Sequence, residues 1–170
     1  MLGTSRHTLR PLTSSDVDVF HSIWGDPEVI WWGASDDPAE TATRLEEFLG
    51  RVAGHSGLGW WLVVLDETGE VIGDVALEPS PLPAGEVEMG WHFKKEHWGG
   101  GHAIESAAAL LGHAFTAAGL HEVVSTIVPM NTRSVSLAER LGMTRRPGIF
   151  MRSGLTHGVW GIHRSTNPDG

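Results

Sequence analysis

The chain has 170 residues and a mass of 18.4 kDa, which predicts a single compact domain. No apolar run approaches the ~18 residues of a membrane span, and residues 1–19 are polar where a signal peptide needs an apolar segment, so we expect a soluble, cytoplasmic protein. The formal net charge of −9 argues against nucleic-acid binding, which needs a basic surface, and favours a neutral or cationic partner.

Strand and helix signals alternate in the N-terminal part of the chain. Residues 7–12 predict a first strand, and residues 13–24 begin with side chains that suit a helix N-cap and continue as a helix. Pro38 opens a second helix, which has apolar residues at helical spacing. Trp31 and Trp32 therefore lie in an irregular segment between two helices.

Three strands are expected next. Residues 60–65 and 70–77 are β-branched and aromatic runs on either side of a turn that ends in glycine, which predicts a hairpin. Residues 86–93 alternate, with Glu86, Glu88 and Gly90 on one face and Val87, Met89 and Trp91 on the other. This strand therefore carries two acids on one face.

A glycine run, Gly99–Gly101, leads into an amphipathic helix that ends at Gly119. Residues 122–128 predict another strand, and residues 131–141 a short helix closed by glycine. The sum is a mixed α/β domain over residues 1–164, followed by a polar tail at 165–170.

The order of strand, glycine run and helix is typical of a phosphate-binding site, because free backbone N–H groups and the helix dipole point at the ligand. Two common phosphate loops do not fit. The Walker pattern needs Lys and Ser or Thr where this chain has His102 and Ala103, and the dinucleotide pattern needs a third glycine at Ile104. An ordinary flexible loop is the alternative.

Three longer segments carry a family resemblance. From Val87 to Met143 the chain reads VEMGWHF, then WGGGHAIESA, then VPMNTRSVSLAERLGM. These segments resemble the GNAT superfamily of acetyl-coenzyme A-dependent N-acetyltransferases, in particular the branch that acetylates ribosomal-protein N-termini. HTLRPLTSSDV and EVIG, earlier in the chain, are similar to that branch too. The resemblance implies a mixed, mostly antiparallel central sheet with helices on both faces.

The resemblance also implies where acetyl-coenzyme A binds. The family's pyrophosphate loop has Gln or Arg, two residues, Gly, one residue, then Gly or Ala; it falls on Glu96, Gly99 and Gly101, so Glu96 departs from the pattern. Asn131 matches an asparagine that contacts the pantetheine arm, and a helix N-cap is its alternative role. The implied cofactor-binding residues are Met89, Trp91, Trp98, Gly99, Gly100, Gly101, His102, Ala103 and Asn131.

For catalysis, the resemblance places a general base at Glu88, whose alternative is a solvent-facing residue beside Glu86. Backbone N–H groups from Met89 to Trp91 would polarise the acetyl carbonyl. Many relatives protonate the thiolate with a tyrosine, but this chain has none. Ser134, which shares a helix face with Asn131, is expected to take that role, and a packing position is its alternative.

Trp31 and Trp32 fall where the family's interhelical loop shapes the acceptor pocket, although packing in the core is the alternative. His92, His97 and His102 recur every five residues, a spacing that does not gather three ligands on one face. We therefore expect no metal.

The expected function is acetyl transfer from acetyl-coenzyme A to a primary amine by direct attack in a ternary complex, since no cysteine is present for a thioester relay. The acceptor would be a protein or peptide N-terminus or a small amine; a small-molecule acetyltransferase acting on an antibiotic or a polyamine is the alternative. A non-catalytic acyl-coenzyme A sensor is a third reading, because Glu96 is atypical. Homodimerisation stays open.

Overall fold

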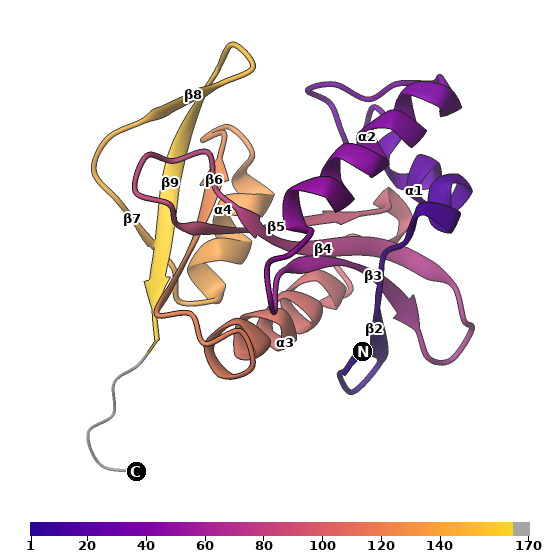
Figure 1. Ribbon diagram of the computed structural model, residues 1–170, viewed down its shortest axis with the longest axis horizontal. Coiled ribbons are helices and arrows are strands. Elements are labelled where there is room, and N and C mark those ends of the chain that lie inside the picture. Colours follow the sequence, from indigo (N-terminus) through magenta and orange to yellow (C-terminus); the bar gives the residue numbers. More distant parts are fainter. Residues whose placement is uncertain (165–170) are drawn as a thin grey trace.

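The computed structural model describes residues 1–164 as a nine-stranded sheet with helices packed on both faces (Figure 1). The predicted tail, residues 165–170, lies outside the described residues. The strands are β1 (Leu2–Gly3), β2 (His7–Pro11), β3 (Gly59–Leu65), β4 (Val71–Pro79), β5 (Val87–Phe93), β6 (Glu122–Ile127), β7 (Thr144–Arg145), β8 (Phe150–Arg152) and β9 (Leu155–His163). The helices are η1 (Ser14–Asp16), α1 (Val17–Trp24), α2 (Pro38–Val52), η2 (Lys95–His97), α3 (His102–Thr116) and α4 (Thr132–Arg140).

The sheet is split between β5 and β6. Its order is β1-β2-β3-β4-β5-β6-β9-β7, with β8 paired to β9, and every neighbouring pair is antiparallel except β5 and β6. β5 pairs with β4 along its whole length, but its parallel register with β6 is the single pair Glu88 and Val124. The two strands therefore diverge beyond Glu88, at the carboxyl end of β5.

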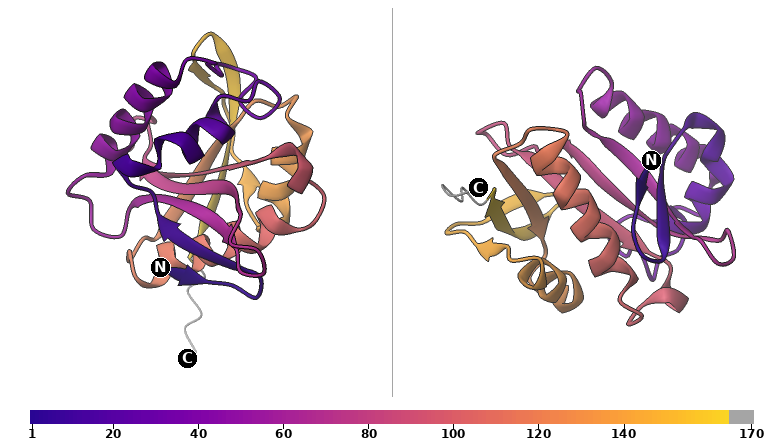
Figure 2. Two further views of the ribbon diagram at one scale, coloured as in Figure 1. Left: turned by 90° about the vertical axis from the view of Figure 1, so that its right-hand side faces the viewer. Right: turned by 90° about the horizontal axis from the view of Figure 1, so that it is seen from below.

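Helices cover the two faces of the sheet separately (Figure 2). α1 and α2 pack on one face through a cluster that includes Phe20, Leu45 and Trp60. α3 packs on the other face, where Leu110 joins Met89 of β5 in a second cluster. α4 contacts β6 and lies beside α3, and its Ala138 joins a third cluster with Ile127 of β6, Met143 and Trp160 of β9. Within residues 1–164, no helix combines the length and apolarity needed to cross a bilayer.

Local signals explain the predicted helix starts. Asp37 caps α2, since its side chain accepts a hydrogen bond from the Ala39 N–H at 2.8 Å, and Pro38 occupies the first turn. Asn131 caps α4 in the same way. The strands and helices expected between residues 7 and 142 are confirmed, with small differences at their ends.

The strands that follow α4 were not expected from the sequence. Residues 158–163 of β9 pair with the whole length of β6, but Gly158 and Gly161 interrupt the strand pattern of β9. A Cβ on Gly158 would lie 2.6 Å from the Trp160 ring and from Arg145, so close packing requires glycine there. The glycines weaken the strand pattern of this segment, so the sequence did not predict β9.

Candidate active site

Two adjoining cavities meet at the divergence of β5 and β6. The first, of about 820 Å³, lies between the glycine run and α4, and we call it the loop cleft. The second, of about 650 Å³, lies between the α1–α2 segment, β5, β6 and the β8–β9 hairpin, and we call it the tryptophan pocket. Both are lined by Trp31, Trp32, Trp91, His92, Asn131 and Ser134. A group held at this junction is reached from both cavities.

The glycine run forms one end of the loop cleft. Gly99 and Gly101 have φ values of 80° and 78°, a left-handed conformation that glycine adopts freely. α3 begins at the next residue, so its first N–H groups face the cleft without a side-chain cap. Of the implied cofactor residues, Trp98, Gly99, Gly101, His102 and Ala103 line this cleft, and Met89 lines the tryptophan pocket; Gly100 is in the loop but lines neither cavity.

Residues 4–6 of the N-terminal segment contact the glycine loop and the first turn of α3. The Glu105 carboxylate, in the first turn of α3, accepts hydrogen bonds from Thr4, Ser5 and Arg6. Burial alone would raise the pKa of the Glu105 carboxyl, but these hydrogen bonds lower it to about 2. Arg6 also donates to the Gly100 carbonyl at 3.1 Å, which places a cation against the loop.

A buried histidine pair lies behind the same loop. His7 is fully buried, and its Nε2 shares a 2.9 Å hydrogen bond with His102 Nδ1. Burial is the main cause that lowers the pKa of His102, and Arg6 and His97 lower it further. Burial therefore favours the neutral form of His102, and the hydrogen bond to His7 anchors its ring.

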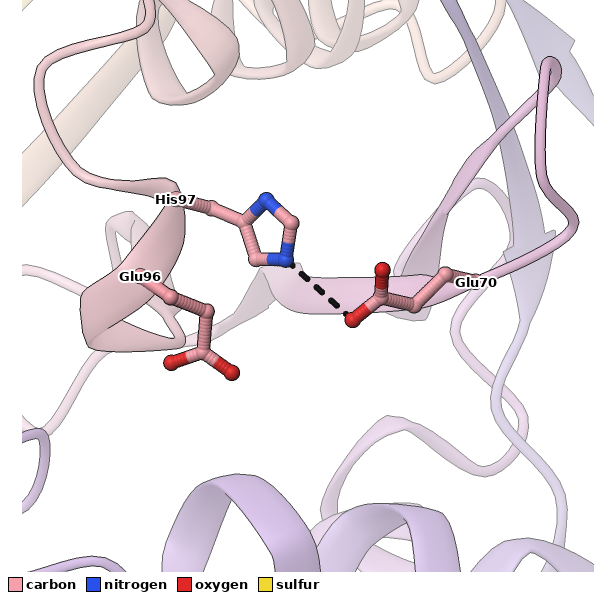
Figure 3. A group of neighbouring side chains, drawn as sticks. All are labelled: Glu70, Glu96 and His97. Atoms are coloured by element: carbon pink, nitrogen blue, oxygen red, sulfur yellow. Dashed lines mark hydrogen bonds and ion pairs between the residues drawn. The ribbon is translucent and has the colours of Figure 1, made fainter.

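Glu96, the residue that departs from the family pattern, does not line the loop cleft, whereas its neighbours His97 and Trp98 do. Its carboxylate lies near the side chains of Glu70 and His97 (Figure 3). The ligand atoms of these three side chains lie within 4.8 Å of one another, and Glu70 accepts a hydrogen bond from His97 at 3.2 Å. Exposed acidic groups often lie together without binding a metal, and both acids here are exposed. The expectation that the protein needs no metal therefore stays a prediction.

Cationic side chains on α4 face the loop cleft. Arg133 and Arg140 line it, and Glu28 is the only acid among its lining residues in the described chain. The Arg133 guanidinium lies 4.4 Å from the centre of the Trp98 ring. These arginines and Arg6 were not singled out in the sequence, because no local motif marks them.

Asn131 and Ser134 lie together at the junction. Asn131 Oδ1 accepts the Ser134 N–H at 3.2 Å, so the N-cap role of Asn131 is confirmed, and its contact with a pantetheine arm stays a prediction. The Trp91 indole donates to Ser134 Oγ at 3.3 Å. Since this bond uses a lone pair of the hydroxyl, the Ser134 proton stays free to donate to another group.

Glu88 is not a solvent-facing residue, so that alternative is wrong: it is 6% exposed. Its Oε1 accepts hydrogen bonds from the N–H and the hydroxyl of Thr126, and its Oε2 accepts from Arg152 at 2.9 Å. Arg152 belongs to β8, which the sequence did not predict, and so this ion pair could not be foreseen. The general-base role of Glu88 stays a prediction.

Core packing is also wrong for the two exposed tryptophans. Trp31 and Trp32 are 42% and 40% exposed, and their rings meet edge to face 5.5 Å apart at the rim of both cavities. Their place beside the junction agrees with a role in acceptor binding, which stays a prediction.

His92 has a buried acid as its partner. Asp74 of β4 is fully buried; its Oδ1 accepts a hydrogen bond from His92 Nδ1 at 2.8 Å, and its Oδ2 accepts from the Trp24 indole at 2.9 Å. His102 bonds to His7 and His97 to Glu70, so the three evenly spaced histidines have separate partners. No motif in the sequence marks the pairing of Asp74 with His92.

This fold, with a glycine loop at a helix start beside diverging central strands, defines the class of acetyl-coenzyme A-dependent N-acetyltransferases. Residues 6–144 match the family described as "Acetyltransferase (GNAT) domain". The chain belongs to this family, and it is an acetyltransferase.

Individual relatives agree. The uncharacterized N-acetyltransferase p20 of Bacillus licheniformis is 29% identical over 147 residues, which are 85% of this chain and 82% of that protein. The crystal structure of an acetyltransferase from Agrobacterium tumefaciens superposes with a TM-score of 0.80 at 32% identity, covering 96% of this chain and 94% of the other. The ribosomal-protein-S5-alanine acetyltransferase from Vibrio fischeri, with a TM-score of 0.76 at 18% identity and 96% coverage of both chains, shows the same fold.

Proposed function

We propose that this protein transfers the acetyl group of acetyl-coenzyme A to a primary amine by direct attack, with the coenzyme in the loop cleft and the amine in the tryptophan pocket. The observation that carries the proposal is the meeting of the two cavities at Trp91, His92 and Ser134. Two substrates, one in each cavity, would bring their reacting groups together there, which is what a ternary complex requires.

The residues present fit coenzyme A. A pyrophosphate suits the N–H groups at the start of α3 and the open space over Gly99, where a side-chain atom would meet nothing within 4 Å. Arg133 and Arg140 in the cleft and Arg6 on the loop give the site the positive charge that phosphates need. When bound, the coenzyme supplies an acetyl thioester.

The backbone of β5 suits polarisation of the acetyl carbonyl. Met89 accepts a hydrogen bond on its carbonyl from Ser125 of β6 at 2.7 Å, so the polar groups of Met89 point toward β6. Because alternate residues of a strand point the same way, the Trp91 N–H faces the divergence between the strands. An N–H there would stabilise developing charge on the carbonyl oxygen.

The contacts of Ser134 support a role at the departing thiolate. Its oxygen accepts from Trp91 and its proton is free, so a hydrogen bond to sulfur costs no existing contact. A serine hydroxyl is a weak acid, and the thiolate is a stable leaving group, so we assign Ser134 a stabilising hydrogen bond rather than full proton transfer.

The tryptophan pocket suits a compact amine. Six aromatic side chains line its walls, namely Trp24, Trp31, Trp32, Phe48, Trp60 and Trp91. Its volume of about 650 Å³ is in the range of small-molecule sites and also admits the first residues of a peptide. A small amine and a peptide N-terminus are therefore both retained as acceptors.

An acceptor screen tests the proposal. The protein is incubated with acetyl-coenzyme A and a panel of peptides with different N-termini, polyamines, aminoglycosides and aromatic monoamines, while thiol release and acetylated products are measured. We expect at least one amine to be acetylated, with one thiol released per product. Tight binding of acetyl-coenzyme A without turnover on any amine would instead identify a sensor.

A further inference from the structure

Asp74 is a buried acid with no arginine or lysine partner among residues 1–164. Its two oxygens accept hydrogen bonds from Trp24 and His92, and His92 is its only ion-pair partner there. Burying a carboxylate between neutral groups is costly, and an apolar residue would pack this face of β4 without that cost. The carboxylate therefore has a use beyond packing, and His92 is the group that it directs.

The hydrogen bond to Asp74 defines the state of the His92 ring. Since the carboxylate accepts at Nδ1, the proton of the neutral imidazole lies on Nδ1 and the lone pair lies on Nε2. No hydrogen bond to Nε2 is found in the part of the chain that the structure describes. A buried carboxylate at Nδ1 also stabilises the imidazolium that forms when Nε2 takes up a proton.

Aromatic side chains hold the ring at the junction of the cavities. Its centre lies 4.5 Å from that of Trp24, 5.9 Å from Trp32 and 6.1 Å from Trp60, with which it is nearly parallel. The His92 side chain is 13% exposed and lines both cavities. The ring is thus oriented on several sides and still open to the site.

Gly90 leaves space beside the ring. It lies between Glu88 and His92 on the same face of β5, and a Cβ placed on it would lie 3.8 Å from His92 Cε1, the carbon between the two ring nitrogens. With no side chain there, an amine over Gly90 would lie beside the nitrogen-bearing edge of His92. Trp91, whose N–H faces the strand divergence, is the next residue.

Glu88, on the other side of Gly90, is a poorer proton acceptor in this geometry. Thr126 and Arg152 already donate hydrogen bonds to its two oxygens, so an amine would have to displace one of these donors to reach the carboxylate. Its contacts join β5 to β6 and to the β8–β9 hairpin. They suit a structural link across the strand divergence.

We infer that His92, held by Asp74, is the general base that takes the proton from the acceptor amine; this rests on the acetyl transfer proposed above. The amine nitrogen forms the new C–N bond with the acetyl carbon while the C–S bond breaks. The electrons of that bond leave with sulfur, which Ser134 stabilises by a hydrogen bond and which takes its proton from solvent. The proton lost by nitrogen moves to His92 Nε2 and from there to solvent, and Asp74 acts as a positioning residue.

The charges around His92 come from several elements. Glu28, on the segment between α1 and α2, lines the loop cleft, and Arg44 of α2 lines the tryptophan pocket. Asp74 faces the ring from β4, and Glu88 lies four positions earlier on β5. Asp74 is the only one of these in hydrogen-bond contact with His92, so it dominates the local electrostatics.

Three variants test the assignment against the acceptor found for the wild type. His92→Gln keeps an N–H for Asp74 but removes the base, and we expect kcat/KM for the amine to fall about 10²- to 10⁴-fold. Asp74→Asn should lower it about 10- to 10³-fold. Affinity for coenzyme A should stay within about threefold in both, because neither side chain belongs to the glycine loop. His55→Gln, an exposed histidine beyond α2, is the matched control and should behave as the wild type.

The pH profile separates a base from a packing residue. Because a general base must be unprotonated to accept a proton, wild-type kcat/KM should rise with pH and then level off. In His92→Gln that rise should be replaced by a shallow increase that continues above pH 8, as more free amine is available. Glu88→Gln should keep the wild-type shape of the profile.

The outcomes are distinguishable. If the wild type acetylates no amine, the proposed function fails and the assignment of His92 fails with it. If the wild type is active and a folded His92→Gln retains activity within about threefold, only the assignment fails. It is equally overturned if Glu88→Gln, and not His92→Gln, abolishes the rise with pH. Because His92 is partly open to the cavities, its variant is informative even if Asp74→Asn does not fold.

Discussion

Replacing Gly101 by valine tests the assignment of the glycine loop. Gly101 has a φ of 78° just before α3, and an L-residue in this left-handed region costs about 1–2 kcal/mol, with a β-branched residue among the worst cases. Gly99 and Gly100 beside it are exposed, so we expect the loop to relax while the fold stays intact. The N–H groups are then no longer aimed into the cleft, and affinity for coenzyme A falls about 5- to 30-fold, the equivalent of that free energy.

Gly54→Val is a matched control for this change. Gly54 has a φ of 79°, and a Cβ on it would meet nothing within 4 Å. It follows α2, and neither cavity is lined by it. Calorimetric titration with coenzyme A and thermal unfolding are measured for both variants. We expect Gly54→Val to bind as the wild type does at a comparable cost in backbone strain. Wild-type affinity in a folded Gly101→Val would refute the assignment of the loop.

Three further outcomes are expected. Ser134→Ala should lower turnover about 10- to 10³-fold at saturating acetyl-coenzyme A, with coenzyme affinity changed only a few-fold; full turnover would return Ser134 to a packing role. Trp31→Ala and Trp32→Ala should raise the acceptor KM with little change in the thermal midpoint, because both rings are 40% exposed or more, and an unchanged KM would contradict their role. The hydrogen bond from Arg10 lowers the pKa of Asp16 to about 2 from 3.8, so its stabilising effect is complete above about pH 5 and is lost as pH falls toward 2. Asp16→Asn should therefore lower the free energy of unfolding by about 1–2 kcal/mol at pH 7, allowing for solvent screening, and urea titrations that show the same deficit at pH 2 would count against it.

Local signals explain most of what the sequence predicted. Asp37 and Pro38 mark the start of α2, and Asn131 that of α4, because caps act within one turn. The hairpin of β3 and β4 follows from two β-branched runs around a glycine turn. Each of these features depends on residues close together in the chain, so pattern and spacing suffice.

The parts that the sequence did not predict depend on distant pairings. Arg152 reaches Glu88 across 64 positions, and Arg6 reaches the carbonyl of Gly100 across 94. Asp74 and His92 meet only because β4 and β5 pair in the register that sets them opposite each other. A strand predicted alone shows which residues share a face, as it did for Glu88 and Gly90, but it does not show what the neighbouring strand presents to them.

The charge of the chain and the charge of the pocket lead to different expectations about the acceptor. The net charge of −9 favours cations in general, but salt screens exposed charges beyond about 10 Å, so the walls decide recognition. The charged residues in the walls of the tryptophan pocket are Arg44, Arg51, Glu78, Glu88 and Arg152. Arg51 pairs with Glu78 and Arg152 with Glu88, both through contacts shorter than 3 Å, so within the described walls no carboxylate is left for a second ammonium group.

Aromatic ring faces remain to attract a single ammonium group and to pack against an apolar body. We therefore expect aromatic or branched monoamines and apolar peptide N-termini to be acetylated with higher kcat/KM than spermidine or spermine, by at least about tenfold. Competition assays at equal concentration, with both products quantified by mass spectrometry, measure this ratio directly. Faster acetylation of a polyamine would contradict this expectation. It would mean that the ion pair of Arg51 with Glu78 or that of Arg152 with Glu88 breaks when the acceptor binds and frees a carboxylate for the second ammonium group.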